Sequence, residues 1–277
     1  MKDLESSEKE YKRLIEVFKA HNIAYFFYNG GNDSADTAFK VSQISKKLNY
    51  PINCIAIPKT VDNDLALTDC CPGFGSAAKY IATSTLEASL DVQSMSETST
   101  KVFILEVMGR HAGWMAASSA LARSEKGDAP HIILLPEITF NQKNFLLTVK
   151  KIVKKNGFCV VVVSEGVKNS KGKFLSESST KDAFGHAQLG GVAPYLAKLV
   201  SEKLKLKNHW AVSDYLQRSA RHIASKTDLN HAEAVGVYAV KYAVQGMNGV
   251  MPIIVRGKGK KYSWKIEPAF LLSLIHI

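Results

Sequence analysis

The sequence contains little cysteine and no long apolar run. Its four cysteines, Cys54, Cys70, Cys71 and Cys159, show neither the paired spacing of a zinc site nor the density of a secreted disulfide scaffold, so we expect reduced thiols. No window approaches the about eighteen uninterrupted apolar residues of a membrane span, and the opening MKDLESSEKEYKRL is charged rather than signal-like. We therefore expect a cytoplasmic protein with no membrane partner.

Motifs for nucleic-acid recognition are also absent, although the formal net charge is +11. Much of the positive charge lies in two short clusters, KKIVKK at 150–155 and RGKGKKYSWK at 256–265, which are typical of solvated helix and hairpin faces. A basic surface suits phosphorylated small molecules as well as polyanions. We expect no nucleic-acid partner, and a nucleic-acid-binding module is the most distant alternative.

Apolar runs alternate with helix-period segments along the 277 residues, of which 46% are hydrophobic. The expected strands are 23–28, 52–57, 102–107, 131–136, 158–165 and 250–256, and the expected helices are 34–48, 75–95, 112–123, 141–155, 190–204, 218–225 and 231–245. This alternation is typical of parallel sheets with helices on both faces. The sequence predicts a doubly wound α/β protein with mostly parallel sheets.

Two polar loops follow the first two strands, at the sheet edge where open α/β proteins place their sites. In NGGNDS, Gly30 and Gly31 allow close approach to a phosphate, and Asn32 and Asp33 add oxygen ligands for Mg²⁺. A turn that merely caps a helix would have the same sequence.

The second loop, PKTVDND, brings Lys59, Asp62 and Asp64 together. A positioned aspartate can take a proton from an attacking hydroxyl, while a lysine neutralises a transferring phosphoryl group and helps to keep that aspartate ionised. An Asx-rich turn without a ligand is an equal alternative for this loop taken alone.

Further strand ends carry MGRHAGW, Pro136-Glu137 and Ser164-Glu165-Gly166. Gly109 permits close approach of a ligand, and Arg110 offers a planar fork for phosphate or sugar oxygens. Glu137 offers acceptors for sugar hydroxyls. The alternatives are a solvated arginine and a turn carboxylate.

In chain order, GGNDS, PKTVDND, GFGSA, EVMGR, LLPE, VVSEG, FGHAQLGG and YLQR resemble the phosphofructokinase family from Gly30 to about Arg256. The resemblance implies two similar Rossmann-like lobes and reversible phosphoryl transfer, in glycolysis, to the 1-hydroxyl of fructose 6-phosphate. It also implies Mg²⁺ as cofactor and a homodimer or homotetramer.

The resemblance assigns roles to particular residues. Asp62 would be the base, aided by Lys59 and Asp33, while Gly30 and Gly31 would contact the donor phosphates and Asn32 and Asp64 the metal. The implied sugar-phosphate contacts are Thr60, Val61, Asp62, Met108, Gly109, Arg110, Glu137, His186, Tyr215 and Arg218, with Lys101 reaching the 6-phosphate in a neighbouring subunit.

Two positions indicate pyrophosphate as the donor. Relatives that use ATP typically carry glycine at the places of Asp33 and Lys59. An acidic side chain at Asp33 fills and charges the space that an ATP α-phosphate needs, whereas Lys59 can stabilise the phosphoryl group of a smaller donor. The sequence departs from the family pattern at Asn32, where many relatives have a metal-binding aspartate, and at Leu189, where ATP-using relatives have an arginine.

The resemblance also implies a division into lobes. We expect a phosphoryl-donor lobe at 1–74, completed by about 190–245, and a fructose 6-phosphate lobe at 75–189, completed by about 246–271. The donor lobe is expected to be incomplete, because the family's first strand and Gly-rich donor loop would precede Met1. The final segment 272–277 has the sequence LSLIHI. It resembles a translated sequencing adaptor and is expected to stand outside the fold.

Two other functions remain open from the sequence. The nearer is an ATP-dependent 6-phosphofructokinase. The second is a truncated, non-catalytic relative that binds a sugar phosphate without transferring anything.

An incomplete donor lobe predicts that the 277-residue chain by itself is poorly soluble or inactive, since a missing strand exposes sheet edge and core. The measurement is soluble yield together with pyrophosphate-dependent turnover of fructose 6-phosphate. A soluble chain with full turnover would contradict this prediction.

Overall fold

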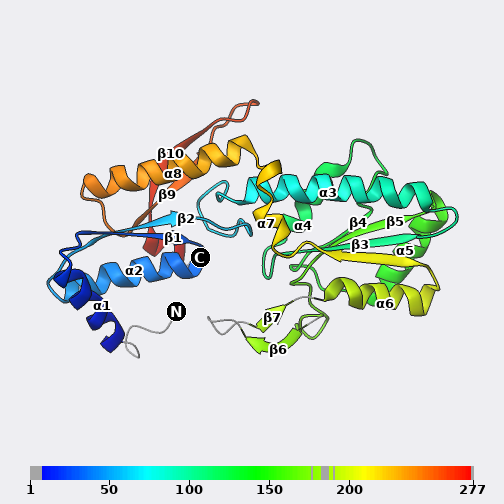
Figure 1. The fold of residues 1–277 in the computed structure, drawn as a ribbon, viewed down its shortest axis with the longest axis horizontal. Coiled ribbons are helices and arrows are strands. Elements are labelled where there is room, and N and C mark those ends of the chain that lie inside the picture. The colour runs from blue at the N-terminus through cyan, green and yellow to red at the C-terminus, as the bar shows by residue number, and fades with distance from the viewer. Residues whose placement is uncertain (1–7, 176, 182–186, 190, 276–277) are drawn as a thin grey trace. The chain divides into compact units, whose positions relative to one another are not determined.

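The computed structural model describes residues 8–175, 177–181, 187–189 and 191–275. The chain forms two compact units, which are described separately. Unit 1 contains the residues up to Gly75 and those from Lys226 onward, and unit 2 contains Ser76–Ser225. In each unit, helices pack on both faces of a four-stranded sheet (Figure 1).

Unit 1 is built around a mixed sheet with the strand order β1-β2-β9-β10. Strands β1, β2 and β9 run parallel, and β10 returns antiparallel to β9. The elements are α1 (Glu8–Ala20), β1 (Tyr25–Gly30), α2 (Asn32–Lys47), β2 (Asn53–Pro58), α8 (Lys226–Val244), β9 (Val250–Arg256), β10 (Trp264–Phe270) and α9 (Leu271–Ile275).

Helices α2 and α8 cover opposite faces of the unit 1 sheet (Figure 1). On the α2 face, the small side chains of Ala35 and Ala38 share a buried cluster with Ala56 and Met251, which lets the helix pack closely on the strands. On the α8 face, Ile55 of β2 belongs to a buried cluster with residues of α8 and β9. Burial on both faces explains why β2 reads as a continuous apolar run.

Unit 2 contains an entirely parallel sheet with the strand order β4-β5-β3-β8. A separate antiparallel pair is formed by β6 and β7. The elements are α3 (Phe74–Met95), which begins at the crossing from unit 1, β3 (Val102–Val107), α4 (Trp114–Ser118), a 3₁₀ turn (Ser119–Ala122), β4 (Ile132–Leu134), α5 (Gln142–Asn156), β5 (Cys159–Ser164), β6 (Glu177–Lys181), β7 (Ala187–Leu189), α6 (Val192–Leu204), β8 (Asn208–Val212), α7 (Leu216–Ser219) and a second 3₁₀ turn (Arg221–Ile223).

Strand β5 is one of the two inner strands of unit 2 and is buried along its whole length. Val161 and Val163 point into a cluster that includes Leu196 of α6, whereas Val160 belongs to a cluster with Val92 of α3 on the opposite face. The valine-rich sequence of β5 therefore follows from its burial on both faces.

The predicted fold class is confirmed, and β3 and β9 have the predicted bounds. Strands β8 and β10 were missed. Both are edge strands with one exposed face, so NHWAV and WKIEPAF lack a continuous apolar run. The helix expected at 218–225 is two short turns, and α8 begins at Lys226, five residues earlier than predicted.

The later segments follow the expected division only in part. Helix α8, within the expected 190–245, lies in unit 1 as expected, but the other segments do not follow it. Helix α6 and strand β8 pack in unit 2, whereas the segment expected to complete the sugar lobe, 246–271, lies in unit 1. The reason is strand pairing, because β9 aligns with β2 through Ile55 and Val250, while β8 pairs with β3. No helix within the described residues is long and apolar enough to cross a membrane.

The segment expected to stand outside the fold contributes to the unit 1 core. Helix α9 packs against α2, and Leu271 and Leu274 are buried in the same cluster as Ala35 and Met251. The segment was expected to stand outside the fold, and this expectation is wrong for the part that ends at Leu274, which packs in the core of unit 1.

This packing predicts a difference between two neighbouring leucines. Leu274 is 8% exposed and Leu272 is 51% exposed. Leu274→Ala should lower the free energy of unfolding by about 2 kcal/mol, because it leaves a cavity, whereas Leu272→Ala should change it by less than about 0.5 kcal/mol. Thermal or urea unfolding measures both, and equal, negligible effects would show that the segment does not pack in the core.

Candidate functional site

The first two loops of unit 1 lie side by side because their strands are in register. Gly30 at the end of β1 pairs with Pro58 at the end of β2, and the Lys59 N–H donates to the Gly30 carbonyl over 3.0 Å. A side chain at Gly30 would clash with Ser34, because a Cβ there would lie 2.5 Å from the Ser34 Cβ. The structure therefore brings Gly30, Gly31 and Lys59 together at the ends of β1 and β2.

The two predicted metal ligands are in direct contact. The Asn32 side-chain amide donates to a carboxylate oxygen of Asp64 over 2.9 Å. Carboxylate and amide oxygens fit Mg²⁺, which usually takes only one or two protein ligands and completes its shell with water and substrate phosphate. Among the described residues, no three His, Cys, Asp or Glu side chains cluster closely enough to hold a metal ion.

The PKTVDND loop is held by hydrogen bonds on both sides of Asp62. The Asp62 N–H donates to Thr60 Oγ1 over 3.1 Å, and Asn63, in a left-handed conformation with φ 54°, accepts from the Cys71 N–H over 2.7 Å. Thr60 also forms a parallel bridge with Gly73. The loop presents Asp62 half-buried on a fixed backbone rather than on a free tip.

Asp228 supports this loop and was missed by the sequence analysis. Its buried carboxylate accepts from the Gly73 N–H over 2.9 Å, so the first turn of α8 is tied to the end of the loop. One sequence contains no signal for this contact, because Asp228 lies 155 positions away from Gly73.

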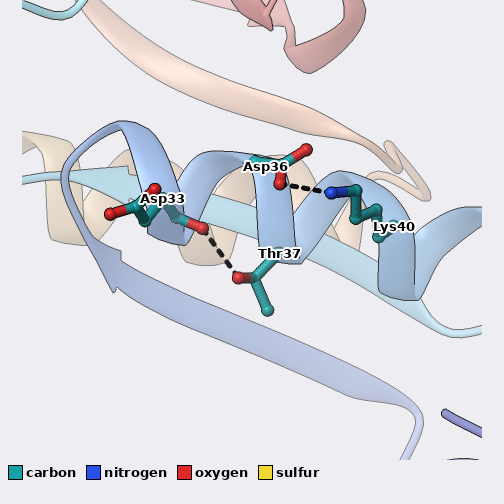
Figure 2. A network of polar contacts seen from close by, with 4 residues as sticks. All are labelled: Asp33, Asp36, Thr37 and Lys40. Carbon is teal, nitrogen blue, oxygen red and sulfur yellow. Dashed lines mark hydrogen bonds and ion pairs between the residues drawn. The ribbon is translucent and has the colours of Figure 1, made fainter. Parts of the chain in front are cut away.

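Asp33 lies in the first turn of α2, where the positive end of the helix dipole favours an anion. Figure 2 shows its main-chain carbonyl accepting from the Thr37 hydroxyl over 2.7 Å, while Asp36 pairs with Lys40 over 2.6 Å one turn further on. The Lys40 ammonium group is thus bound by Asp36. Asp33 and Lys59 both lie at the edge of the sheet where β1 and β2 end.

In unit 2, the turn Met108-Gly109-Arg110 leaves the end of β3 in a conformation that needs glycine. Gly109 has φ +130°, and a Cβ there would lie 2.5 Å from the Ala112 carbonyl oxygen. The Gly109 N–H donates to Glu165 over 3.3 Å, and the Ser164 hydroxyl donates to the Gly109 carbonyl. Ser164 at the end of β5 and Glu165 just after it therefore fix the turn after β3, as expected for neighbouring parallel strands.

Glu137 makes a backbone contact that the sequence did not predict. Its Oε1 accepts from the Gly113 N–H over 2.7 Å, at the start of α4. The carboxylate therefore orients the end of the MGRHAG loop, and its other oxygen faces the same glycine closely enough that a Cβ at Gly113 would lie 2.7 Å from it. A sugar contact by Glu137 stays a prediction.

Tyr215 and Arg218, which the family resemblance assigns to the sugar phosphate, lie together. The Arg218 guanidinium stacks over the Tyr215 ring at 4.2 Å from its centroid. Both side chains are exposed, whereas Gln217 between them is buried and accepts from the Met108 N–H over 3.2 Å. The structure thus connects two predicted substrate-binding segments, 108–110 and 215–218, within unit 2.

Strand β3 carries a buried carboxylate, Glu106, two residues before Met108. Glu106 accepts from the N–H groups of Gly191 and Ala193 over 3.1 and 2.8 Å, at the start of α6. Burial raises the pKa of Glu106, and hydrogen bonds from the start of α6 oppose that effect. Glu106 was missed as a supporting residue because it stands within an apolar strand.

One predicted residue, Lys101, is not brought to this edge of the unit 2 sheet. Lys101 precedes β3, at the opposite end of the strand from Met108, and its ammonium group donates to the carbonyls of Ser96 and Glu97 after α3. Its contact with a neighbouring subunit stays a prediction. His186 lies outside the described residues.

The comparisons with known proteins agree with these motifs. A sequence model of the family described as "Phosphofructokinase" matches residues 1–243. The chain is 60% identical to the pyrophosphate–fructose 6-phosphate 1-phosphotransferase of Halomonas elongata, over 99% of the chain and 65% of the relative. It is 56% identical to the protein of the same name from Methylococcus capsulatus, over 100% of the chain and 66% of the relative.

A solved structure shows the same fold. The pyrophosphate-dependent phosphofructokinase from Nitrosospira multiformis superposes with a TM-score of 0.88 at 60% identity, covering 98% of this chain and 64% of that one. The chain belongs to the phosphofructokinase family. It spans just under two thirds of the length of these curated relatives, 65% and 66%.

The two adjacent glycines of unit 1 predict different effects of the same substitution. Gly30→Ala should destabilise the protein by about 2 kcal/mol, because Ser34 would have to move. At Gly31 a Cβ would have no neighbour closer than 3.8 Å, so Gly31→Ala should leave the free energy of unfolding within about 0.5 kcal/mol. Urea unfolding of the two variants measures this difference, and equal losses would contradict the described packing of the loop.

Proposed function

We propose that this chain carries residues of a pyrophosphate-dependent phosphofructokinase, which converts pyrophosphate and fructose 6-phosphate into phosphate and fructose 1,6-bisphosphate. The observation that carries the proposal is the identity of 56–60%, over nearly the whole chain, to proteins named for this reaction. The strand-end loops add support, since both units gather at one edge of their sheets the residue types that bind phosphate and move a proton.

The proposed chemistry is an in-line transfer of one phosphoryl group. Asp62 takes the proton from the sugar's 1-hydroxyl, the resulting oxygen forms a bond to phosphorus, and the bond from that phosphorus to the bridging oxygen of pyrophosphate breaks. Lys59 neutralises the phosphoryl oxygens as charge develops. The hydrogen bonds around Asp62 hold its backbone, so the carboxylate is placed before the substrate binds.

A divalent cation completes the donor site in this proposal. Asn32 and Asp64 would supply the protein oxygens for it, since their side chains lie within 2.9 Å of each other, although the amide now turns its nitrogen to Asp64. When bound, Mg²⁺ neutralises pyrophosphate oxygens. The roles of Met108, Gly109, Arg110, Tyr215 and Arg218 are to hold the sugar phosphate, with Arg110 and Arg218 supplying positive charge.

We further propose that the protein acts in the cytoplasm as a homodimer or homotetramer, in which Lys101 reaches a neighbouring subunit. The support is the membership of the phosphofructokinase family. Pyrophosphate is favoured over ATP by Asp33 and Lys59.

The role of Asp62 is tested in an exchange protein, in which these 277 residues replace their matching segment in the Halomonas elongata relative. Asp62→Ser should lower kcat by a factor of about 10² to 10⁴, because the general base is lost. The Kd for fructose 6-phosphate should change by less than about threefold, since the main contacts to the phosphate remain. Steady-state kinetics and calorimetry measure both quantities, and unchanged turnover would remove Asp62 from this role.

The donor preference is tested in the same exchange protein with the double substitution Asp33→Gly and Lys59→Gly. We expect kcat/KM for pyrophosphate to fall by about 10²-fold, because one transition-state charge contact is lost. The kcat/KM for ATP should rise relative to that for pyrophosphate, because the space for its α-phosphate opens. Lys40→Gln, in the neighbouring pair with Asp36, is the control for a general charge effect. An unchanged donor ratio would refute the assignment of these two positions.

A further inference from the structure

Helix α7 has one buried side chain. Gln217 is 2% exposed, whereas its neighbours Tyr215 and Leu216 are each 63% exposed. A buried primary amide must find partners for both its oxygen and its nitrogen, because an unsatisfied group would cost more than the hydrogen bond contributes. The partners of Gln217 therefore reveal what it holds together.

Those partners belong to two different segments. The Gln217 Oε1 accepts from the Met108 N–H over 3.2 Å, and its Nε2 donates to the Asp214 carbonyl over 2.8 Å. Asp214 has φ 38°, in the left-handed region that non-glycine residues seldom adopt. The amide thus closes the turn that carries Tyr215 and Arg218, and joins it to the turn that carries Met108 and Arg110.

This bond continues the strand pairing beyond the end of the sheet. Strands β3 and β8 pair in parallel as far as Glu106 and Val212, and the Ser213 N–H still donates to the Glu106 carbonyl over 2.9 Å. Beyond the bond between Ser213 and Glu106, the segments that follow β3 and β8 no longer form a strand pair with each other. Gln217 bridges them there, and the flanking Tyr215 and Arg218 side chains remain exposed.

We propose that Gln217 is a positioning residue that sets the Met108-Arg110 turn against the Tyr215-Arg218 turn for binding of the sugar phosphate. This inference rests on the proposed function. Two cationic side chains on separate turns bind one phosphate well only if their spacing is fixed beforehand, because ordering them on binding costs affinity. Gln217 fixes the backbones of both turns while its own side chain stays away from solvent.

Two substitutions of Gln217 should affect its hydrogen bonds to Met108 and Asp214 in different ways. Gln217→Met keeps the length of the side chain and removes both hydrogen bonds. In Gln217→Glu, the protonated acid can still accept from Met108 with one oxygen and donate to Asp214 with its hydroxyl. The ionised carboxylate cannot donate, and it faces the Asp214 carbonyl. Function should therefore return to the Glu variant as the pH falls, and should not return to the Met variant.

The first test is hydrogen exchange of the ligand-free exchange protein that carries these 277 residues. Exchange at the Met108 amide should become up to about tenfold faster in Gln217→Met, because its acceptor is gone. Leu216→Ala, on the exposed side of the same short helix, is the matched control and should leave this rate unchanged. Equal Met108 exchange in the wild type and Gln217→Met overturns the inference, whatever the affinity for sugar phosphate.

The second test is calorimetric binding of fructose 6-phosphate between pH 5.5 and 8, with each variant expressed as a ratio to the wild type at the same pH. We expect the Kd of Gln217→Met to be about tenfold higher at every pH. The Kd of Gln217→Glu should be about tenfold higher at pH 8 and approach the wild-type value at pH 5.5. The pyrophosphate affinity of all variants should be unchanged.

The two tests separate the positioning role from the proposed function. A wild-type chain that binds no fructose 6-phosphate counts against the proposed function, and the exchange rate of Met108 then still decides whether Gln217 holds the turn. Wild-type affinity in Gln217→Met, or a Glu variant whose Kd ratio does not depend on pH, overturns the positioning role. If Gln217→Met does not fold, the pH response of Gln217→Glu decides.

Discussion

Parallel pairing in register is the constraint on which the rest of the structure depends. Because Gly30 pairs with Pro58 in unit 1, and Val107 pairs with Ser164 in unit 2, neighbouring strands end at the same level. The loops that follow must then lie side by side. Residues far apart in the sequence, such as Asn32 and Asp64, meet through this register, and their contact needs no special feature of the loops themselves.

Register brings the loops together, but buried and half-buried polar side chains give them their shapes. Asp228 holds Gly73, Glu165 holds Gly109, and Gln217 holds Met108. Each of these groups accepts from a backbone N–H that the sheet ladder no longer satisfies. The residues assigned to chemistry are therefore supported by a set of side chains that do not themselves need to touch substrate.

The sequence predicted the parts of the structure that repeat a pattern. Strand β3 was predicted with its observed bounds because its apolar run is buried on both faces, and GGNDS and PKTVDND were placed correctly at strand ends. Edge strand β8 lacked such a run, and the pairing of β9 with β2 depends on contacts nearly two hundred residues apart. The supporting role of Gln217 was not predicted, because a single sequence does not show which polar side chain of YLQR is buried.

The central claim is that these residues belong to a sugar-phosphate kinase that takes its phosphoryl group from pyrophosphate. The most direct test is the rate of fructose 1,6-bisphosphate formation by the unmodified exchange protein, with Mg²⁺ and either pyrophosphate or ATP as the sole donor. We predict a kcat/KM for pyrophosphate at least about 10²-fold above that for ATP, a difference of about 2.7 kcal/mol in transition-state stabilisation. Equal rates with both donors, or faster transfer from ATP, would contradict the account.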